Sequence, residues 1–207
     1  GGWPSNGRGG GVHIDYGSPI IQGNFFDDNW SFDSTGVGGA GGAGVYNYLG
    51  NPTIRNNTFY QNTVYLITSV GGGGGIYSSS GNPIIQGNTF SDNHLSSYNS
   101  QVGESGGSSI YIAQGNPAIH DNSFVDNTSH WGGTIRIVSG APTIQNNVLS
   151  HNTGGGIYND SGSPVIRNNT LNGNSGSGIY GGSGAATVRS NIVANGTDIG
   201  IYGVNGQ

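Results

Sequence analysis

The chain has 207 residues and a net charge of −5 at pH 7, with 43 glycines and only 7% charged residues. Its five basic residues are all arginines, too few for the positive surface that nucleic acid or an anionic bilayer requires, so we expect no nucleic-acid partner and no membrane insertion. The absence of cysteine excludes disulfides and thiolate metal sites.

One repeated unit organises the chain, and its clearest copy occupies residues 74–93. The unit reads Gly-Gly-Ile-Tyr, then Gly-x-Pro-x-Ile, then Asn-x-Phe-x-x-Asn, and the last full copies are 22 residues apart, as from Pro142 to Pro164. Each copy holds three short β-branched runs, and no apolar pattern has helical spacing. We therefore predict one all-β domain over residues 1–207, a right-handed parallel β-helix (solenoid) of about seven coils. Neighbouring coils should lie about 4.8 Å apart, and residues 1–8 should form an N-terminal extension.

Period-two alternation predicts two columns of inward apolar side chains, one aliphatic and one that begins with phenylalanines. The first comprises Ile21, Ile54, Ile85, Ile119, Ile144, Ile166 and Val188, and the second comprises Phe26, Phe59, Phe90, Phe124, Leu149, Leu171 and Val193. Between these columns every copy has an asparagine, namely Asn24, Asn57, Asn88, Asn122, Asn147, Asn169 and Asn191. We expect these amides to form a ladder, each donating to the coil on one side and accepting from the coil on the other. A second asparagine column comprises Asn29, Asn62, Asn93, Asn127, Asn152 and Asn174, and it slips to Asn195 in the last copy.

Two further columns should face outward. Tyrosines follow the inward isoleucine of the Ile-Tyr element at Tyr46, Tyr77, Tyr111, Tyr158, Tyr180 and Tyr202, with Arg136 interrupting them. Such a column either binds sugar or shields the sheet face by cross-strand packing. The other column comprises Gln22, Arg55, Gln86, His120, Gln145, Arg167 and Arg189, and its arginines have no acid beside them in the column, which fits a solvated face better than a catalytic base.

The first three coils contain inserts, all placed after the second asparagine, at residues 30–41, 63–73 and 94–108. Because inserts at one place in successive coils project from one face, we expect them to form a single lobe, and repeat proteins often bind ligands on such a face. The predicted binding residues of this lobe are Trp30, Phe32, Tyr65 and Tyr98 in the inserts, together with Trp131 in a shorter bulge at residues 129–131. The alternative is that the inserts only cover the flank of the rod.

Few acidic residues are placed for catalysis. Asp92 and Asp126 should lie one coil apart, near the lower limit of the separation that glycoside hydrolysis requires, and Asp121 lies on the same coil as Asp126. These three residues are the candidates for catalysis, and Asp121 and Asp126 are the candidates for calcium, the only cofactor considered. The competing interpretation is a set of solvated acids that keep the rod soluble.

The Phe-x-x-Asn elements at residues 26–29, 59–62, 90–93 and 124–127, preceded by Gly-Gly-x-Ile-like runs, resemble the repeats of secreted bacterial surface proteins. Polymorphic outer membrane protein passengers are the most similar form. The resemblance covers nearly the whole chain and implies an extracellular, cell-surface location and a role in adhesion. The coil is also similar to that of pectate lyases, polysaccharide epimerases and phage tailspikes, so the resemblance indicates the fold more strongly than an activity.

The two ends of the repeat array suggest self-association. A solenoid exposes unpaired strand edges at each end unless a cap covers them, and no cap is evident in the sequence. Val12 and Ile14 of one molecule could pair with Ile201, Tyr202 and Val204 of another and form an open filament. The chain could equally be a segment of a longer passenger. We expect an extracellular structural or adhesive protein that polymerises end to end, with a glycan as a second partner; the alternative is a polysaccharide-binding or polysaccharide-cleaving protein.

Overall fold

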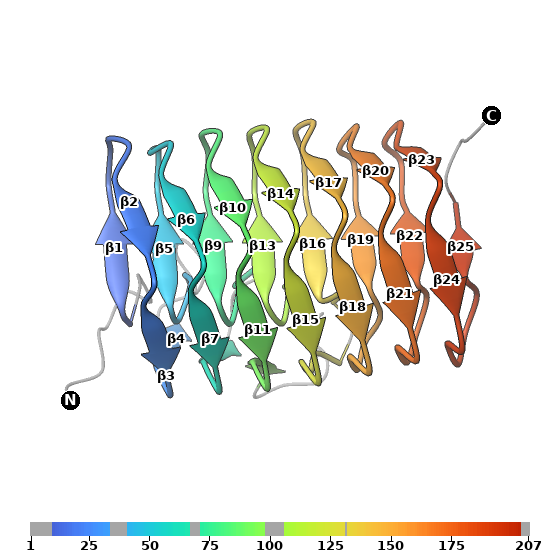
Figure 1. Cartoon of the computed structure of the whole chain (residues 1–207), viewed down its shortest axis with the longest axis horizontal. Helices are drawn as coiled ribbons and strands as arrows, with labels where there is room; N and C mark the ends of the chain where they lie inside the picture. The colour runs from blue at the N-terminus through green and yellow to red at the C-terminus, as the bar shows by residue number, and fades with distance from the viewer. Residues whose placement is uncertain (1–9, 34–40, 67–70, 98–105, 131, 204–207) are drawn as a thin grey trace.

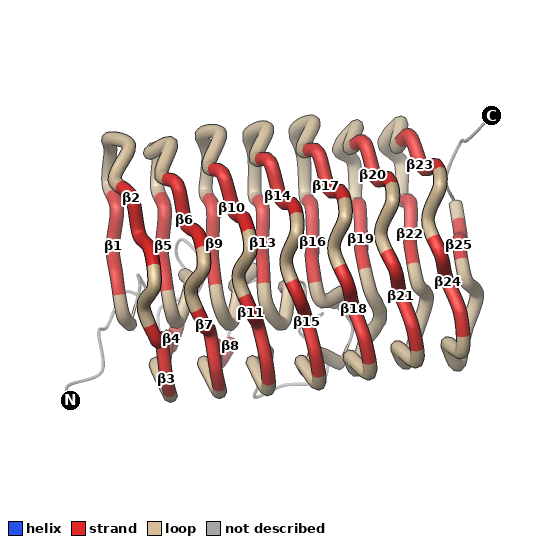
Figure 2. Tube along the Cα trace, in the orientation of Figure 1, coloured by secondary structure: helices blue, strands red, loops and turns tan. Residues whose placement is uncertain are grey.

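The computed structural model describes residues 10–33, 41–66, 71–97, 106–130 and 132–203. Within these residues the chain winds into a rod of stacked coils, with the N-terminal coil at one end and the C-terminal coil at the other (Figure 1). All of their regular structure is short β-strand joined by turns (Figure 2), so the predicted all-β solenoid is confirmed. The described residues contain no helix long and apolar enough to cross a membrane.

Three long parallel sheets run along the rod. The first contains β1 (Val12–Ile14), β5 (Val45–Asn47), β9 (Ile76–Ser78), β13 (Ile110–Ile112), β16 (Ile135–Ile137), β19 (Ile157–Asn159), β22 (Ile179–Gly181) and β25 (Ile201–Tyr202). The second contains β2 (Ile20–Gln22), β6 (Thr53–Arg55), β10 (Ile84–Gln86), β14 (Ala118–His120), β17 (Thr143–Gln145), β20 (Val165–Arg167) and β23 (Thr187–Arg189). The third contains β3 (Phe25–Asp27), β7 (Thr58–Tyr60), β11 (Thr89–Ser91), β15 (Ser123–Val125), β18 (Val148–Ser150), β21 (Thr170–Asn172) and β24 (Ile192–Ala194).

The core lies between these sheets and consists of stacked identical positions. Parallel pairing keeps the repeat in register, so that Ile85 lies between Ile54 and Ile119. The phenylalanine rings of neighbouring coils stack with centroids 4.7 Å apart and nearly parallel planes, as between Phe90 and Phe124. Towards the C-terminus the ring is replaced by leucine and then by valine, and the core becomes thinner.

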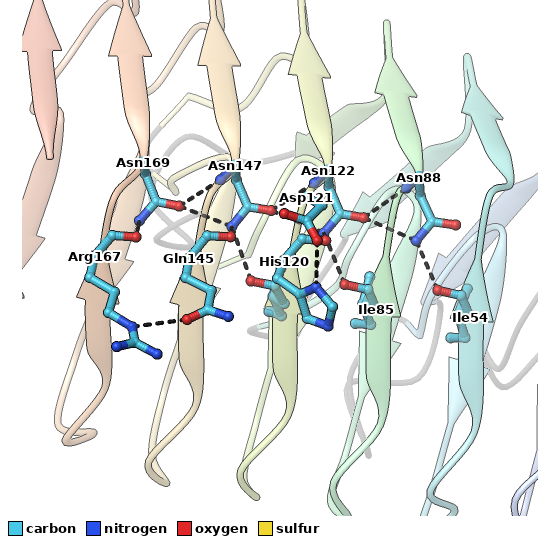
Figure 3. Close-up of polar contacts among 11 residues, drawn as sticks. Ile54, Ile85, Asn88, His120, Asp121, Asn122, Gln145, Asn147, Arg167 and Asn169 are labelled. Carbon is cyan, nitrogen blue, oxygen red and sulfur yellow. Dashed lines mark hydrogen bonds and ion pairs between the residues drawn. The ribbon is translucent and has the colours of Figure 1, made fainter.

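The asparagine ladder is confirmed for the first column. At Asn122, Oδ1 accepts the backbone N–H of Asn88 at 2.9 Å and its amide N–H at 3.0 Å. The Asn122 amide donates to Oδ1 of Asn147 at 3.0 Å and to the carbonyl of Ile85 at 2.9 Å (Figure 3). The same pattern joins successive rungs from Asn24 to Asn191. The second column repeats it from Asn29 to Asn174, so two amide ladders stabilise the turns on either side of the third sheet.

Both of these turns contain a residue with φ between 50° and 69° in every coil, the left-handed region. Before the third sheet the residues are Gly23, Asn56, Gly87, Asp121, Asn146, Asn168 and Ser190, and after it they are Asp28, Gln61, Asp92, Asp126, His151, Gly173 and Asn195. Glycine, asparagine and aspartate tolerate this conformation better than other residues do. The turn geometry alone therefore favours aspartate at the three positions considered for catalysis.

The first tyrosines of the column face away from the main core, but the expectation that they are exposed is wrong. Tyr46, Tyr77 and Tyr111 are buried and stack with ring centroids 5.1 Å apart. The chain returning from an insert lies against Tyr111, since a Cβ atom on Gly71 would lie 2.6 Å from the Tyr111 ring. Coils without long inserts leave the later tyrosines partly open, and Tyr202 keeps 49% of its surface exposed.

The inserts begin as strands, which the sequence analysis did not predict. A fourth parallel sheet contains β4 (Trp30–Asp33), β8 (Thr63–Leu66) and β12 (His94–Ser97), and in Figure 1 it lies behind the first strands of the third sheet. Val64, Leu66 and Leu95 point inward and pack with Ala43 as a small second core. The fourth sheet is therefore fixed to the rod by apolar contacts of its own.

Candidate functional site

The outward face of the fourth sheet gathers aromatic side chains. The register pairs Trp30 with Thr63 and Phe32 with Tyr65, while Ser31, in between, is buried. Trp30 and Phe32 are two residues apart on one strand, so both rings lie on the face opposite the small core. We call Trp30, Phe32 and Tyr65 the aromatic face.

Local contacts orient these rings. The Trp30 indole donates its Nε1–H to Oδ1 of Asp28 at 2.8 Å, and Trp30 keeps 47% of its surface exposed. The rings of Phe32 and Tyr65 stack with centroids 5.8 Å apart and planes 12° from parallel. Trp30 is exposed, whereas Phe32 and Tyr65 are half-buried, so the three rings offer part of their apolar area beside polar groups, which is the usual composition of a small-ligand surface.

The structure brings three of the five predicted binding residues together. The other two, Tyr98 and Trp131, lie outside the described residues. His94 follows Thr63 in the same outward row, because β12 pairs with β8 in register. The sequence analysis missed His94, although this half-buried residue alternates with the buried Leu95 in the manner of a half-buried strand. Thr63 is itself buried.

A protein-family model described as a right handed beta helix region matches residues 5–163 and 93–207. The chain belongs to this family. The stacked parallel sheets of the β-helix agree with the match, which also fixes the right-handed coil. No curated protein and no solved structure matches the chain. The likeness to secreted surface passengers remains a prediction.

The β-helix does not bring its three candidate acids together. Asp121 and Asp126 lie at opposite ends of β15, in two different turns. Asp92 and Asp126 occupy equivalent turn positions one coil apart, and the backbone N–H of Asp92 donates to the carbonyl of Val125 at 3.3 Å. Among the described residues no three histidine, cysteine or acidic side chains form a group that could hold a metal ion. The carboxylates of Asp121 and Asp126 therefore do not form one calcium site.

Asp121 instead pairs locally with the preceding residue. A ring nitrogen of His120 lies 2.9 Å from its Oδ2 (Figure 3). This hydrogen bond is the main reason why the pKa of Asp121 is lowered, and contacts with Asn146 and Gln86 add to it. The Asp121 side chain keeps 48% of its surface exposed, and its partial burial opposes the lowering of this pKa.

Arg136 and Asp160 form a partly buried ion pair that the sequence analysis missed. Nε and Nη2 of Arg136 donate to the two carboxylate oxygens at 3.1 and 3.0 Å, and the register places Arg136 between Tyr111 and Tyr158. Burial raises the pKa of the Tyr111 hydroxyl, and the nearby arginine partly opposes this shift. The arginine that interrupts the tyrosine column is thus a structural cation with its own counter-ion.

The predicted assembly residues lie in the outermost described strands of the first sheet. Val12 and Ile14 belong to β1, which pairs with β5, and Ile201 and Tyr202 belong to β25, which pairs with β22. Ile201 and Tyr202 are exposed. Val204 lies outside the described residues. Within the described part of the chain, each of these two strands has one neighbour only.

Proposed function

We propose that this protein is an extracellular structural and adhesive rod whose aromatic face binds a glycan. The observation that carries the proposal is the in-register stacking of β4 and β8, which gathers Trp30, Phe32 and Tyr65 on one face of the fourth sheet. The two amide ladders support it, because they make the rod a rigid carrier for this face.

The chemistry of the face favours a neutral or weakly polar sugar. A pyranose has one apolar face that can lie on an aromatic ring, and its hydroxyls can reach polar groups at the edge. The half-buried side chain of His94 lies in the outward row beside the rings and supplies such a group. Trp30 is already oriented by Asp28, so little side-chain entropy is lost when a ligand binds.

The test is binding to a panel of immobilised glycans by Trp30→Ala, Phe32→Ala and Tyr65→Ala variants. Each should weaken binding by about tenfold, equivalent to about 1.4 kcal/mol. Tyr16→Ala is the matched control, because Tyr16 is 70% exposed and lies away from the fourth sheet. Unchanged binding by all three variants, or an equal loss in the control, would contradict the proposal.

We also propose that the rod associates end to end. The support is that β1 and β25 each have a single described neighbour, which leaves strand edges able to pair with another chain. Electron microscopy over a range of concentrations, with and without a calcium chelator, tests this. Long fibres that repeat at about the length of one rod support it, and their loss with chelator would place calcium at the joint. Discrete short rods at every concentration would refute it.

A further inference from the structure

The outward column of the second sheet carries an unusual share of the positive charge. Parallel pairing aligns its members coil by coil, ending with Gln145, Arg167 and Arg189. Together with Arg55, three of the five arginines of the chain lie in this single column. The chain as a whole is acidic, so this concentration of arginine makes the second sheet chemically different from the rest of the surface.

Glutamines hold two of these arginines by the same contact. Nε of Arg167 donates to Oε1 of Gln145 at 2.9 Å, and Nε of Arg55 donates to Oε1 of Gln22 at 2.9 Å. Figure 3 shows the Arg167 side chain reaching along the column to Gln145. Because this contact uses only Nε, the terminal nitrogens of the guanidinium stay available, and so does the amide nitrogen of the glutamine. The column therefore presents oriented hydrogen-bond donors.

Arg167 and Arg189 are direct neighbours with no acidic partner. The register pairs them, so their backbones are about 4.8 Å apart. The side chain of Arg189 makes no hydrogen bond or ion pair within the described residues, whereas Arg136 has Asp160. The nearest acid on this face, Asp121, is two coils from Arg167 and is paired with His120. Two like charges at opposed positions on neighbouring strands destabilise a sheet. An anion bound between Arg167 and Arg189 would relieve this repulsion.

The surface beside this pair is open along the rod axis. The neighbouring outward column on the same strands consists of Thr143, Val165 and Thr187. These side chains are short, so an extended polymer could lie over them with its charged groups towards the arginines. The two columns together form a track that follows the stacking direction of the coils.

From this arrangement we propose that the second sheet binds a carboxylated polysaccharide along the rod axis, with Arg167 and Arg189 clamping its carboxylates and Gln145 positioning Arg167. The guanidinium fork matches a carboxylate with two parallel hydrogen bonds. This site is separate from the aromatic face and does not depend on the proposed function.

The test is titration of fluorescent polygalacturonate oligomers at low salt, with a calcium chelator present. We expect the Arg167→Gln, Arg189→Gln double variant to bind more than about tenfold more weakly than the wild type. The matched control is Thr89→Asp, Ser150→Asp, which makes an equal change in net charge on the outward face of the third sheet. It should weaken binding by less than about threefold. No binding by the wild type, or equal losses in the two variants, overturns the proposal.

A double lysine variant separates recognition by the guanidinium fork from simple charge attraction. It also tests the proposal if the double glutamine variant fails to fold. Arg167→Lys, Arg189→Lys keeps both charges and should still lose about threefold to tenfold in affinity. Affinity equal to that of the wild type would refute the carboxylate clamp. Single-stranded DNA of equal charge is the competing probe. Tighter binding of DNA through the same arginines would assign the surface to nucleic acid and overturn the proposal.

Discussion

Replacing one rung of the amide ladder tests whether the ladder stabilises the rod. Asn122→Ala removes Oδ1, which accepts two donors from Asn88: its backbone N–H at 2.9 Å and its amide N–H at 3.0 Å. Asn88 is 1% exposed, so water cannot replace the lost acceptor without rearrangement. At about 1–3 kcal/mol for each unsatisfied buried group, two orphaned donors predict a loss of about 2–6 kcal/mol. This is a large part of the stability of an ordinary domain, which is about 5–15 kcal/mol.

The assay is urea unfolding followed by circular dichroism, with the free energy of unfolding compared between variants. Asn24→Ala is the matched control, because Oδ1 of Asn24 accepts no hydrogen bond within the described residues and the side chain is exposed. It leaves no buried donor unpaired and should cost less than about 1 kcal/mol. If Asn122→Ala cost no more than Asn24→Ala, the asparagines would be there for turn geometry alone, and the account of the ladder would be wrong.

Three further predictions concern the core, the turns and pH. Phe124→Ala should cost about 3–5 kcal/mol in urea unfolding, because the Phe124 ring is fully buried and stacks on Phe90. An unchanged or stabilised variant would contradict this account of the core. Asp126 has φ 55°, in the left-handed region. Asp126→Gly should therefore leave the free energy of unfolding nearly unchanged, whereas Asp126→Val should lower it by about 1–2 kcal/mol in the same assay. Equal costs for the two variants would refute the left-handed turn. Burial raises the pKa of Tyr111 and of Tyr158 above 10.0, so the folded rod resists their ionisation, and its stability should hold below pH 10 and fall as the pH rises through the folded-state values. Ultraviolet titration checks this, and a single transition near pH 10 for all tyrosines would refute it.

The sequence predicted the long sheets because each coil repeats the same side-chain requirements. In a parallel stack, Ile85 contacts Ile54 and Ile119, so a column of identical residues in the sequence becomes a column in space. The asparagine ladder could be predicted for the same reason. A one-residue slip would place the asparagine at a core position, and this fixes the register.

The sequence did not predict what the inserts do, because their pairing is not part of the repeat. Trp30-Ser31-Phe32 alternates as a strand does, but on one strand alone this signal is short and weak. The burial of Tyr111 depends on chain that returns against it from an insert, so local alternation gave the wrong exposure. The bidentate pair of Arg136 and Asp160 joins residues 24 apart, a distance that no local pattern reveals.

The ladder also has a direction, and this direction restricts how two rods can meet. Every rung donates its backbone N–H to the asparagine oxygen of the following coil, so Asn169 donates to Asn191. The described stack therefore ends with a donor at Asn191 and begins with an acceptor at Asn24. A second copy translated along the rod axis would bring that acceptor to that donor, whereas a copy turned end over end would oppose donor to donor. Any fibre built by end-to-end contact must therefore be polar, and one whose averaged images had twofold symmetry across its axis could not be built from this ladder.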